Sequence, residues 1–288
     1  MATRYSPTIR RRRLSSELRR VRLASGKTGE EVARTAGLSK STFSNIESGV
    51  KKRPRIREVR AILDACGMEP GPEFDEVLLL CRQALDRGWW SRYRDVVASP
   101  YVGFETEADD ICTWQPLVLP GLLQTPEYMR VTAQACLSVP HDIRRFTDAR
   151  LIRQRILDDE DPPLLRAIFD EGALLRLRTQ PDILVRQVRH LLEMSERPNI
   201  TVQMTLADRL NPGSGGPFVI MDFPHPVDPT VVYLETTADG IYLEDSDEVA
   251  RYRTLAEHLR LVALRPGETL DHLRETYLEA PSARSGRP

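Results

Sequence analysis

The chain has 288 residues, of which 41% are hydrophobic and 29% charged, and its formal net charge is −1. This length allows two domains with ordinary cores, and the composition is that of a soluble globular protein rather than a disordered or fibrous one. No apolar run approaches the roughly 20 residues that cross a bilayer, and no apolar stretch follows the basic N-terminus as in a secretion signal, so we expect a cytoplasmic protein.

Charge is distributed very unevenly along the chain. Residues 1–60 carry 17 Lys and Arg against 5 Asp and Glu, a net charge of +12, whereas the other 228 residues carry 24 against 37, a net charge of −13. A basic head of this kind is typical of a segment that binds a polyanion, and the acidic remainder is expected to have a different role.

The first helices are predicted from apolar spacing and end signals. Apolar residues recur at helical spacing in "LSSELRRVRLASG", which starts at Leu14, and the helix is expected to end before Gly26. Thr28, followed three residues later by Glu31, makes the capping-box pattern of a second helix. A sharp turn at Gly37 follows, where glycine accommodates positive φ.

A third short helix is predicted after this turn. Ser39 is its expected N-cap, Phe43 and Ile46 are its inward positions, and Gly49 ends it. Ala33 is small, as a crossing of two helices requires. Two short helices joined by a glycine-containing turn predict a helix-turn-helix. The alternative is an ordinary helical hairpin, which leaves the following basic run "KKRPRI" unexplained.

Together, "LSSELRRVRLASG", "TGEEVARTAGLSKSTFSNIESG" and "KKRPRI" resemble the Xre/Cro-type helix-turn-helix transcriptional regulators from residue 14 to about residue 68. The resemblance implies an all-α domain of five helices that reads DNA with its third helix. It implies base contacts from Lys40, Ser41 and Asn45, since Lys pairs with guanine and Asn with adenine in the major groove. The phosphate contacts that it implies are Thr28, Thr42, Ser44, Lys51, Lys52, Arg53 and Arg55.

Two further positions bear on this resemblance. Arg22 matches a family arginine that pairs with a glutamate at the position of Glu47, although two independent surface charges are the alternative. Gly29 stands where the family often has a glutamine that donates to a phosphate. One backbone contact is therefore in doubt, although amides at the helix N-terminus can bind a phosphate instead.

Two more helices are predicted before the pattern changes. "AILDACG" at residues 61–67 is a fourth, and "PEFDEVLLLCRQAL", starting at Pro72, is a fifth whose broad apolar face can close the head, join it to the body or pair with a second subunit. The predicted domains are a helix-turn-helix domain at 1–70, a linker helix within 71–100, an α+β domain at 101–280 and a disordered tail at 281–288.

Alternating apolar and polar residues predict strands in the body, whereas longer stretches with helical spacing predict helices. The expected strands are 111–115, 164–169, 200–206, 218–223, 231–235 and 241–244. The expected helices are 126–137, 141–158, 181–195, 246–264 and 267–279. The chain as a whole is thus predicted to be α+β, with a mainly antiparallel sheet in the C-terminal domain.

The ordered motifs "VLPGLLQTPEYMR", "ARLIRQRILDDEDPP", "DEGALLR" and "GGPFVIMDF" resemble an uncharacterised C-terminal domain common in actinobacterial regulators, from about residue 101 to 278. This resemblance implies no ligand, but it does imply a small partner protein encoded nearby. We therefore predict a sequence-specific DNA-binding transcriptional regulator, a homodimer, whose C-terminal domain senses a partner protein or ligand. An antitoxin-like protein that neutralises a small partner is the alternative.

No catalytic motif, metal-ligand spacing or phosphate-binding loop is recognisable, so neither enzymatic activity nor a cofactor is predicted. The acidic "LEDSDE" run is interpreted as a solvated helix start, and the four separated cysteines as buried, reduced thiols. "PLVLPGLLQT" and the upstream tryptophan suggest a ligand or partner groove formed by Trp114, Pro120, Gly121 and Gln124. A packed loop is the alternative.

Overall fold

The computed structural model describes residues 7–51, 53–85, 88–93, 95, 99–136, 140–226, 228–236 and 240–279. Lys52 and the tail at 281–288 lie outside the described residues. The chain divides into two compact units, the first made of Met1–Arg92, Val102–Glu107 and His225–Asp228, and the second of the rest. The domain boundaries expected from the sequence stay predictions.

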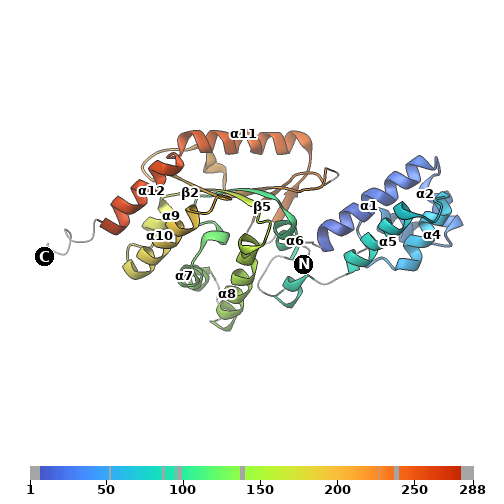
Figure 1. The fold of residues 1–288 in the computed structure, drawn as a ribbon, viewed down its shortest axis with the longest axis horizontal. Coiled ribbons are helices and arrows are strands. Elements are labelled where there is room, and N and C mark those ends of the chain that lie inside the picture. The colour runs from blue at the N-terminus through green and yellow to red at the C-terminus, as the bar shows by residue number, and fades with distance from the viewer. Residues whose placement is uncertain are drawn as a thin grey trace. The chain divides into compact units, whose positions relative to one another are not determined.

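The N-terminal part of the first unit, up to residue 85, is built from α-helices (Figure 1). They are α1 (Pro7–Ala24), α2 (Gly29–Thr35), α3 (Lys40–Glu47), α4 (Ile56–Cys66) and α5 (Pro72–Leu85). The five-helix arrangement expected of this part of the chain is therefore present, and α2 and α3 form the predicted pair of short helices.

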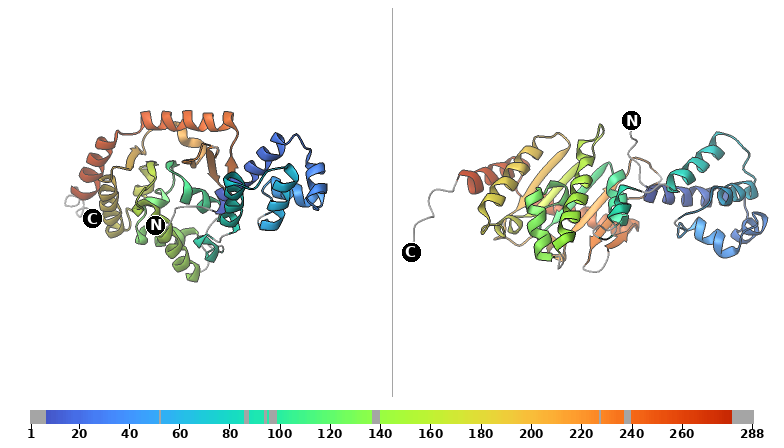
Figure 2. Two further views of the ribbon diagram at one scale, coloured as in Figure 1. Left: turned by 45° about the vertical axis from the view of Figure 1, so that its right-hand side comes forward. Right: turned by 90° about the horizontal axis from the view of Figure 1, so that it is seen from below.

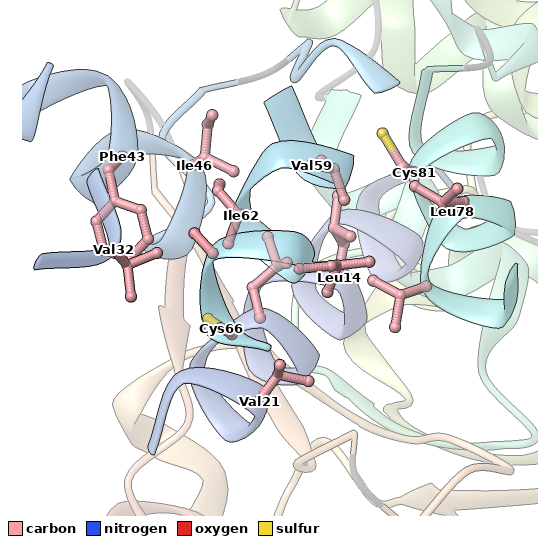
Figure 3. Close-up of a cluster of buried hydrophobic side chains, with 14 of the residues drawn as sticks. Leu14, Val21, Val32, Phe43, Ile46, Val59, Ile62, Cys66, Leu78 and Cys81 are labelled. Atoms are coloured by element: carbon pink, nitrogen blue, oxygen red, sulfur yellow. The ribbon is translucent and has the colours of Figure 1, made fainter. Parts of the chain in front are cut away.

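One apolar cluster holds these five helices together (Figure 3). Phe43 and Ile46 of α3 are 3% and 2% exposed and lie against Val32 of α2 and Ile62 of α4 in this cluster. Phe74, Val77, Leu78 and Cys81 of α5 belong to the same cluster. Of the roles left open for the fifth helix, closing the head is the one that the structure shows.

The first helix starts earlier than its apolar spacing indicates. It begins at Pro7 rather than near Leu14, and Ile9 within it is fully buried. Arg13 also faces inward, where it is 8% exposed and pairs with Glu107 and Asp228 of the same unit. A charged residue at an inward position interrupts the apolar spacing, so the spacing alone does not predict this part of the helix.

The second unit is built on one six-stranded sheet (Figure 1). Its strands are β1 (Asp110–Gln115), β2 (Leu164–Asp170), β3 (Ile200–Thr205), β4 (Phe218–Asp222), β5 (Val231–Glu235) and β6 (Gly240–Leu243). All six predicted strands are confirmed. The order is β3-β2-β1-β4-β5-β6, in which β1, β2 and β3 run parallel while β4, β5 and β6 pair antiparallel.

Three of the five strand pairings are antiparallel and two are parallel, so the expectation of a mainly antiparallel sheet is confirmed only in part, and the sheet is mixed. Parallel strands need a long crossover, and the chain between β1 and β2 supplies one with helices in it. Strand periodicity carries no information on the direction of a neighbour, so the sequence pattern identified the strands and not their pairing.

Helices cover both faces of this sheet. On one face lies α11 (Ser246–Val262), while α7 (Pro126–Cys136), α8 (Pro140–Gln154) and α10 (Pro181–Ser195) lie on the other (Figures 1 and 2). The last long helix is α12 (Pro266–Arg274). The structure adds α6 (Ser99–Glu107), α9 (Gly172–Leu175) and short turns of helix at Trp89–Arg92, Gly121–Leu123 and Pro212–Gly215. The last residues of the predicted helices 141–158 and 267–279 form a 3-10 turn at Arg155–Asp158 and a π-helical turn at Glu275–Glu279.

A partly buried carboxylate anchors the C-terminal end of the second unit. Glu171, directly after β2, accepts hydrogen bonds from His272 of α12 at 3.0 Å and from the Tyr277 hydroxyl at 2.9 Å. Burial raises the pKa of Glu171, but the hydrogen bonds from His272 and Tyr277 outweigh it, so the pKa lies below its ordinary value. The anchor is thus an ionised carboxylate.

Gly37 provides a test of the turn between α2 and α3. Its φ is +67°, and an added Cβ would meet no atom within 4 Å, so Gly37→Ala introduces backbone strain without a clash. The substitution should lower the opening free energy of α2 and α3 amides by about 1 kcal/mol, measured by hydrogen exchange on the full chain. Gly71→Ala is the control, because that site is equally open and lacks positive φ. Equal effects at both sites would contradict this account.

Candidate nucleic-acid interface

Helix α3 is placed by its cap and by its inward side chains. The Ser39 hydroxyl accepts a hydrogen bond from the Thr42 backbone N–H at 3.1 Å, which starts the helix. Phe43 and Ile46 then lie in the core of the first unit. With these two positions buried, the rotation of the helix about its axis is determined, and its opposite side faces solvent.

The exposed side of α3 is polar. Lys40 and Ser44 are one turn apart, as are Ser41 and Asn45, and all four side chains are exposed. The Asn45 side-chain amide makes no hydrogen bond to any residue that the structure describes, so its donors and acceptor are available. Amide and ammonium groups on one exposed helix face are the groups that pair with base edges in a major groove. The three side chains expected to contact bases thus share one surface.

Arg22 and Glu47 form the predicted pair between α1 and α3. The Arg22 Nε and Nη2 atoms donate to the two carboxylate oxygens of Glu47 at 2.6 Å and 3.2 Å, a bidentate arrangement. Both side chains are about five-sixths buried, at 16% and 17% exposed. The hydrogen bond to Glu47 raises the pKa of Arg22 more than burial lowers it. The alternative of two independent surface charges is excluded, and the pair ties the polar helix to α1.

The cations after α3 divide into exposed and internally paired groups. Arg53 and Arg55 are exposed. The Lys51 ammonium instead donates to both carboxylate oxygens of Glu58, at 2.9 Å and 2.7 Å. Burial raises the pKa of Glu58, but the hydrogen bonds from Lys51 and from the Arg55 backbone outweigh it and lower the pKa overall. Arg53 and Arg55 are therefore better placed to meet phosphates than Lys51, whose charge is already compensated.

Two hydroxyls that were expected to contact phosphates also have structural roles. Thr28 accepts a hydrogen bond from the Glu31 N–H at 3.3 Å, and the Glu31 carboxylate accepts one from the Thr28 N–H at 2.8 Å, so the predicted capping box is confirmed. The Thr42 hydroxyl accepts from Ser39 at 2.8 Å and is half-buried. Ser44 is exposed, and no hydrogen bond orients its hydroxyl among the described residues.

The departure at Gly29 has a steric explanation. A Cβ at this position would lie 3.0 Å from a ring carbon of Phe43, closer than ordinary van der Waals contact. The start of α2 therefore packs directly on the ring that anchors α3, and a glutamine here would displace that ring.

Sequence reasoning missed Val50 at this surface. Its side chain is 66% exposed, directly after Gly49 and before the cations. An exposed apolar side chain beside a polar helix can contact a thymine methyl group. Its only sequence signal is an isolated apolar residue between the helix end and the basic run.

The four residues of the expected C-terminal groove do not share a surface. Trp114 on β1 is 1% exposed and belongs to the apolar cluster beneath α11, and its indole N–H donates to the Gly213 carbonyl at 2.9 Å. Gln124 is 2% exposed and accepts a hydrogen bond from Arg150 of α8, on the opposite side of the sheet (Figure 1). Pro120 is buried, and Gly121 is half-buried.

The loop that contains Pro120 and Gly121 is held by side-chain amides. Gln124 donates to the Leu119 carbonyl at 2.7 Å, and Gln154 donates to the carbonyls of Gly121 and Gln124 at 3.1 Å and 2.8 Å. Fully buried Gln187 accepts from the Thr125 N–H and donates to the Leu123 carbonyl, both at 2.8 Å. These bonds satisfy the loop's backbone groups, as the packed-loop alternative requires.

The acidic run before α11 has an ordinary structural role. Asp245 caps α11 by accepting hydrogen bonds from the backbone N–H groups of Asp247 and Glu248, which confirms the helix-start interpretation. Among the described residues no group of three or more His, Cys, Asp or Glu is arranged to hold a metal ion.

Three of the four cysteines can be compared with the expectation of buried thiols. Cys66, Cys81 and Cys112 are buried and free, as expected. The side chain of Cys136 lies outside the described part of the chain. No described helix is long and apolar enough to cross a membrane.

Two family models match this chain. One, described as "Domain of unknown function (DUF5753)", covers residues 98–275, which is more than half of the chain. The chain belongs to the DUF5753 family. The other, described as "Helix-turn-helix domain", covers residues 13–77 and thus most of the five helices of the first unit. No curated protein and no solved structure matches the chain.

The DUF5753 chain therefore carries a helix-turn-helix domain in front of an uncharacterised C-terminal domain, as the two resemblances implied. The helix-turn-helix match supports a DNA-binding regulator. The matched segment contains the whole polar face of α3 and ends within α5, in agreement with the place of α5 in the core of the first unit.

The Arg22–Glu47 pair gives a second prediction. A double-mutant cycle of Arg22→Met and Glu47→Gln should show a coupling free energy of about 1 kcal/mol in the stability of the helical unit, since the hydrogen bonds are charged and mostly buried. Hydrogen exchange of α1 and α3 amides in the full chain measures it. The exposed Lys40–Glu30 pair is the control, with an expected coupling below about 0.5 kcal/mol. A coupling at Arg22–Glu47 no larger than the control would show that α3 is not tied in this way.

Proposed function

We propose that this DUF5753 chain is a cytoplasmic, sequence-specific DNA-binding transcriptional regulator that inserts α3 into the major groove. The observation that carries the proposal is the single exposed face of α3, on which Lys40, Ser41 and Asn45 lie opposite the buried Phe43 and Ile46. A helix so anchored presents its polar side chains to a duplex without rearrangement. Arg53 and Arg55 lie in the segment after α3, where they can pair with phosphates and fix its position along the backbone.

The proposed binding form is a homodimer on a two-fold symmetric site. One recognition helix of eight residues covers only a few base pairs, which is too little to specify a site in a genome. Two copies that bind half-sites one helical turn apart multiply the specificity of one copy. Footprinting on selected fragments tests this arrangement through the spacing of the half-sites.

The C-terminal domain is proposed to sense a ligand or partner and to change DNA affinity, with no catalytic step assigned to it. Sensing requires that the signal bind two states of the protein with different affinity. The antitoxin-like alternative, with a small partner protein, stays a prediction.

Asn45 should carry sequence specificity. Asn45→Ala removes an exposed amide that makes no structural hydrogen bond among the described residues, so folding should be unchanged. Affinity for the preferred site should fall by about 1–3 kcal/mol, and the preference at one base position should relax. Competition binding on a randomised operator library measures both. A uniform loss over all sequences would contradict a base contact.

Arg53 should carry non-specific affinity instead. For four to six neutralised phosphates per subunit, log K against log salt should have a slope of about −4 to −5. Arg53→Ala should flatten this slope by about 1 per subunit and weaken all sequences alike. The control is Arg209→Ala, which also removes one exposed cation but from the C-terminal domain. It should leave the slope unchanged. An unchanged slope for Arg53→Ala would show that Arg53 does not contact a phosphate.

A further inference from the structure

A cavity of about 600 Å³ lies on the face of the sheet that α11 covers, within the second unit. Strands β1 to β4 form its floor, while α11 and the start of α12 form its wall. Volumes of this order, about 300–1,000 Å³, are typical of small-molecule sites. No motif in the sequence indicated this cavity, because its lining comes from six separate elements.

The floor of the cavity changes from apolar to cationic across neighbouring strands. Ile220 of β4 pairs in register with Cys112 of β1, Cys112 with Arg166 of β2, and Arg166 with Thr201 of β3. Burial raises the pKa of the Cys112 thiol to about 11, so at neutral pH this thiol is an uncharged part of the floor. The floor therefore offers an apolar surface on one side of a guanidinium and a hydroxyl on the other.

The wall adds positive charge. Arg253, Glu257 and Arg260 lie one turn apart along α11 and line the cavity together with Arg265, so the lining holds four arginines and one carboxylate. Each of these arginines has an acidic neighbour, but the Arg260–Glu257 pair is more than half exposed and contributes little to stability. An entering anion can replace Glu257 as the partner of Arg260 at small cost. The N-terminal residue of α12, Pro266, also lines the cavity, and the helix dipole adds to the positive potential there.

Arg166 has unused hydrogen-bonding capacity. Its Nη2 atom donates to Asp110 at 2.6 Å, which holds the guanidinium in place. Its Nε atom is buried and has no hydrogen-bond partner among the described residues. That atom itself is inaccessible, but the Arg166 side chain as a whole is 41% exposed, and an arginine is suited to bind a planar or tetrahedral oxyanion with several donors at once.

We propose that this cavity binds a small organic anion whose carboxylate or phosphate group pairs with Arg166 and Arg260 and whose apolar body lies against Cys112, Ile220 and Ala256. This proposal names a ligand class for the sensing role that is proposed above. Only the regulatory consequence of binding rests on that role. The binding itself is tested without DNA, so a failure here leaves the DNA-binding proposal standing.

The test is isothermal titration calorimetry on the full chain with three probes that each carry a six-carbon alkyl chain, namely hexyl phosphate, heptanoate and hexylamine. One or both anions should bind at one site per chain, and the tighter anion identifies the head group. Hexylamine should not bind. The proposal would be overturned if neither anion showed saturable binding, or if hexylamine bound as tightly as the anions.

Variants locate the site. Arg166→Gln should weaken anion binding at least about tenfold, since it removes a charged hydrogen-bond donor. Arg197→Gln is the matched control and should bind like the unaltered chain, because Arg197 is 39% exposed and ion-paired to Asp158 at 2.7 Å, much as Arg166 is 41% exposed and paired to Asp110 at 2.6 Å.

Two exposed positions on α11 keep the test valid if Arg166→Gln does not fold. Arg260→Gln should weaken anion binding about threefold or more, whereas Glu257→Gln should strengthen it, because the competing carboxylate is removed. Opposite signs from two neighbouring residues are not expected of general destabilisation. Unchanged affinity in both variants would place any bound anion elsewhere and overturn the assignment.

Discussion

The burial of Phe43 and Ile46 is the constraint on which the proposed DNA interface depends. These two side chains lie in the cluster formed by all five helices, so α3 cannot rotate without opening that cluster. The polar face of α3 is exposed because the opposite face of the helix packs into the core. The start of α2 packs so closely on the Phe43 ring that only glycine fits at residue 29 without displacement. The same contact thus explains both the orientation of the recognition helix and the local departure from the family pattern.

Charge in this chain is used for structure as well as for binding. Arg13, Arg22 and Lys51 all count toward the basic head, yet each pairs with a carboxylate inside the first unit. The net charge of residues 1–60 therefore overstates the charge available to phosphates, and the position of each cation matters more than their number. In the second unit the opposite holds, because an acidic segment contains a cavity whose charged lining residues are four arginines and one glutamate.

Buried polar side chains also explain why one expected site is a packed loop. "PLVLPGLLQT" combines apolar residues with a few polar ones, which is the composition of a pocket wall and of a well-satisfied loop alike. The side-chain amides of Gln124, Gln154 and Gln187 form hydrogen bonds with the backbone of this loop. Nothing in the local pattern reveals the last two, since they come from helices about 30 and 60 residues further on.

Local sequence patterns are enough to predict the features that depend on neighbouring residues. These are the capping box at Thr28, the inward positions of α3, the positive-φ turn at Gly37, and the existence of all six strands, because spacing and local backbone preference are encoded within one helix or strand. Family resemblance added the Arg22–Glu47 pair, which joins residues 25 apart. Three features become visible only in the folded chain: the strand directions, the inward orientation of Arg13 and the cavity around Arg166. Each of these depends on which distant segment lies opposite a residue, and periodicity along the chain does not specify that.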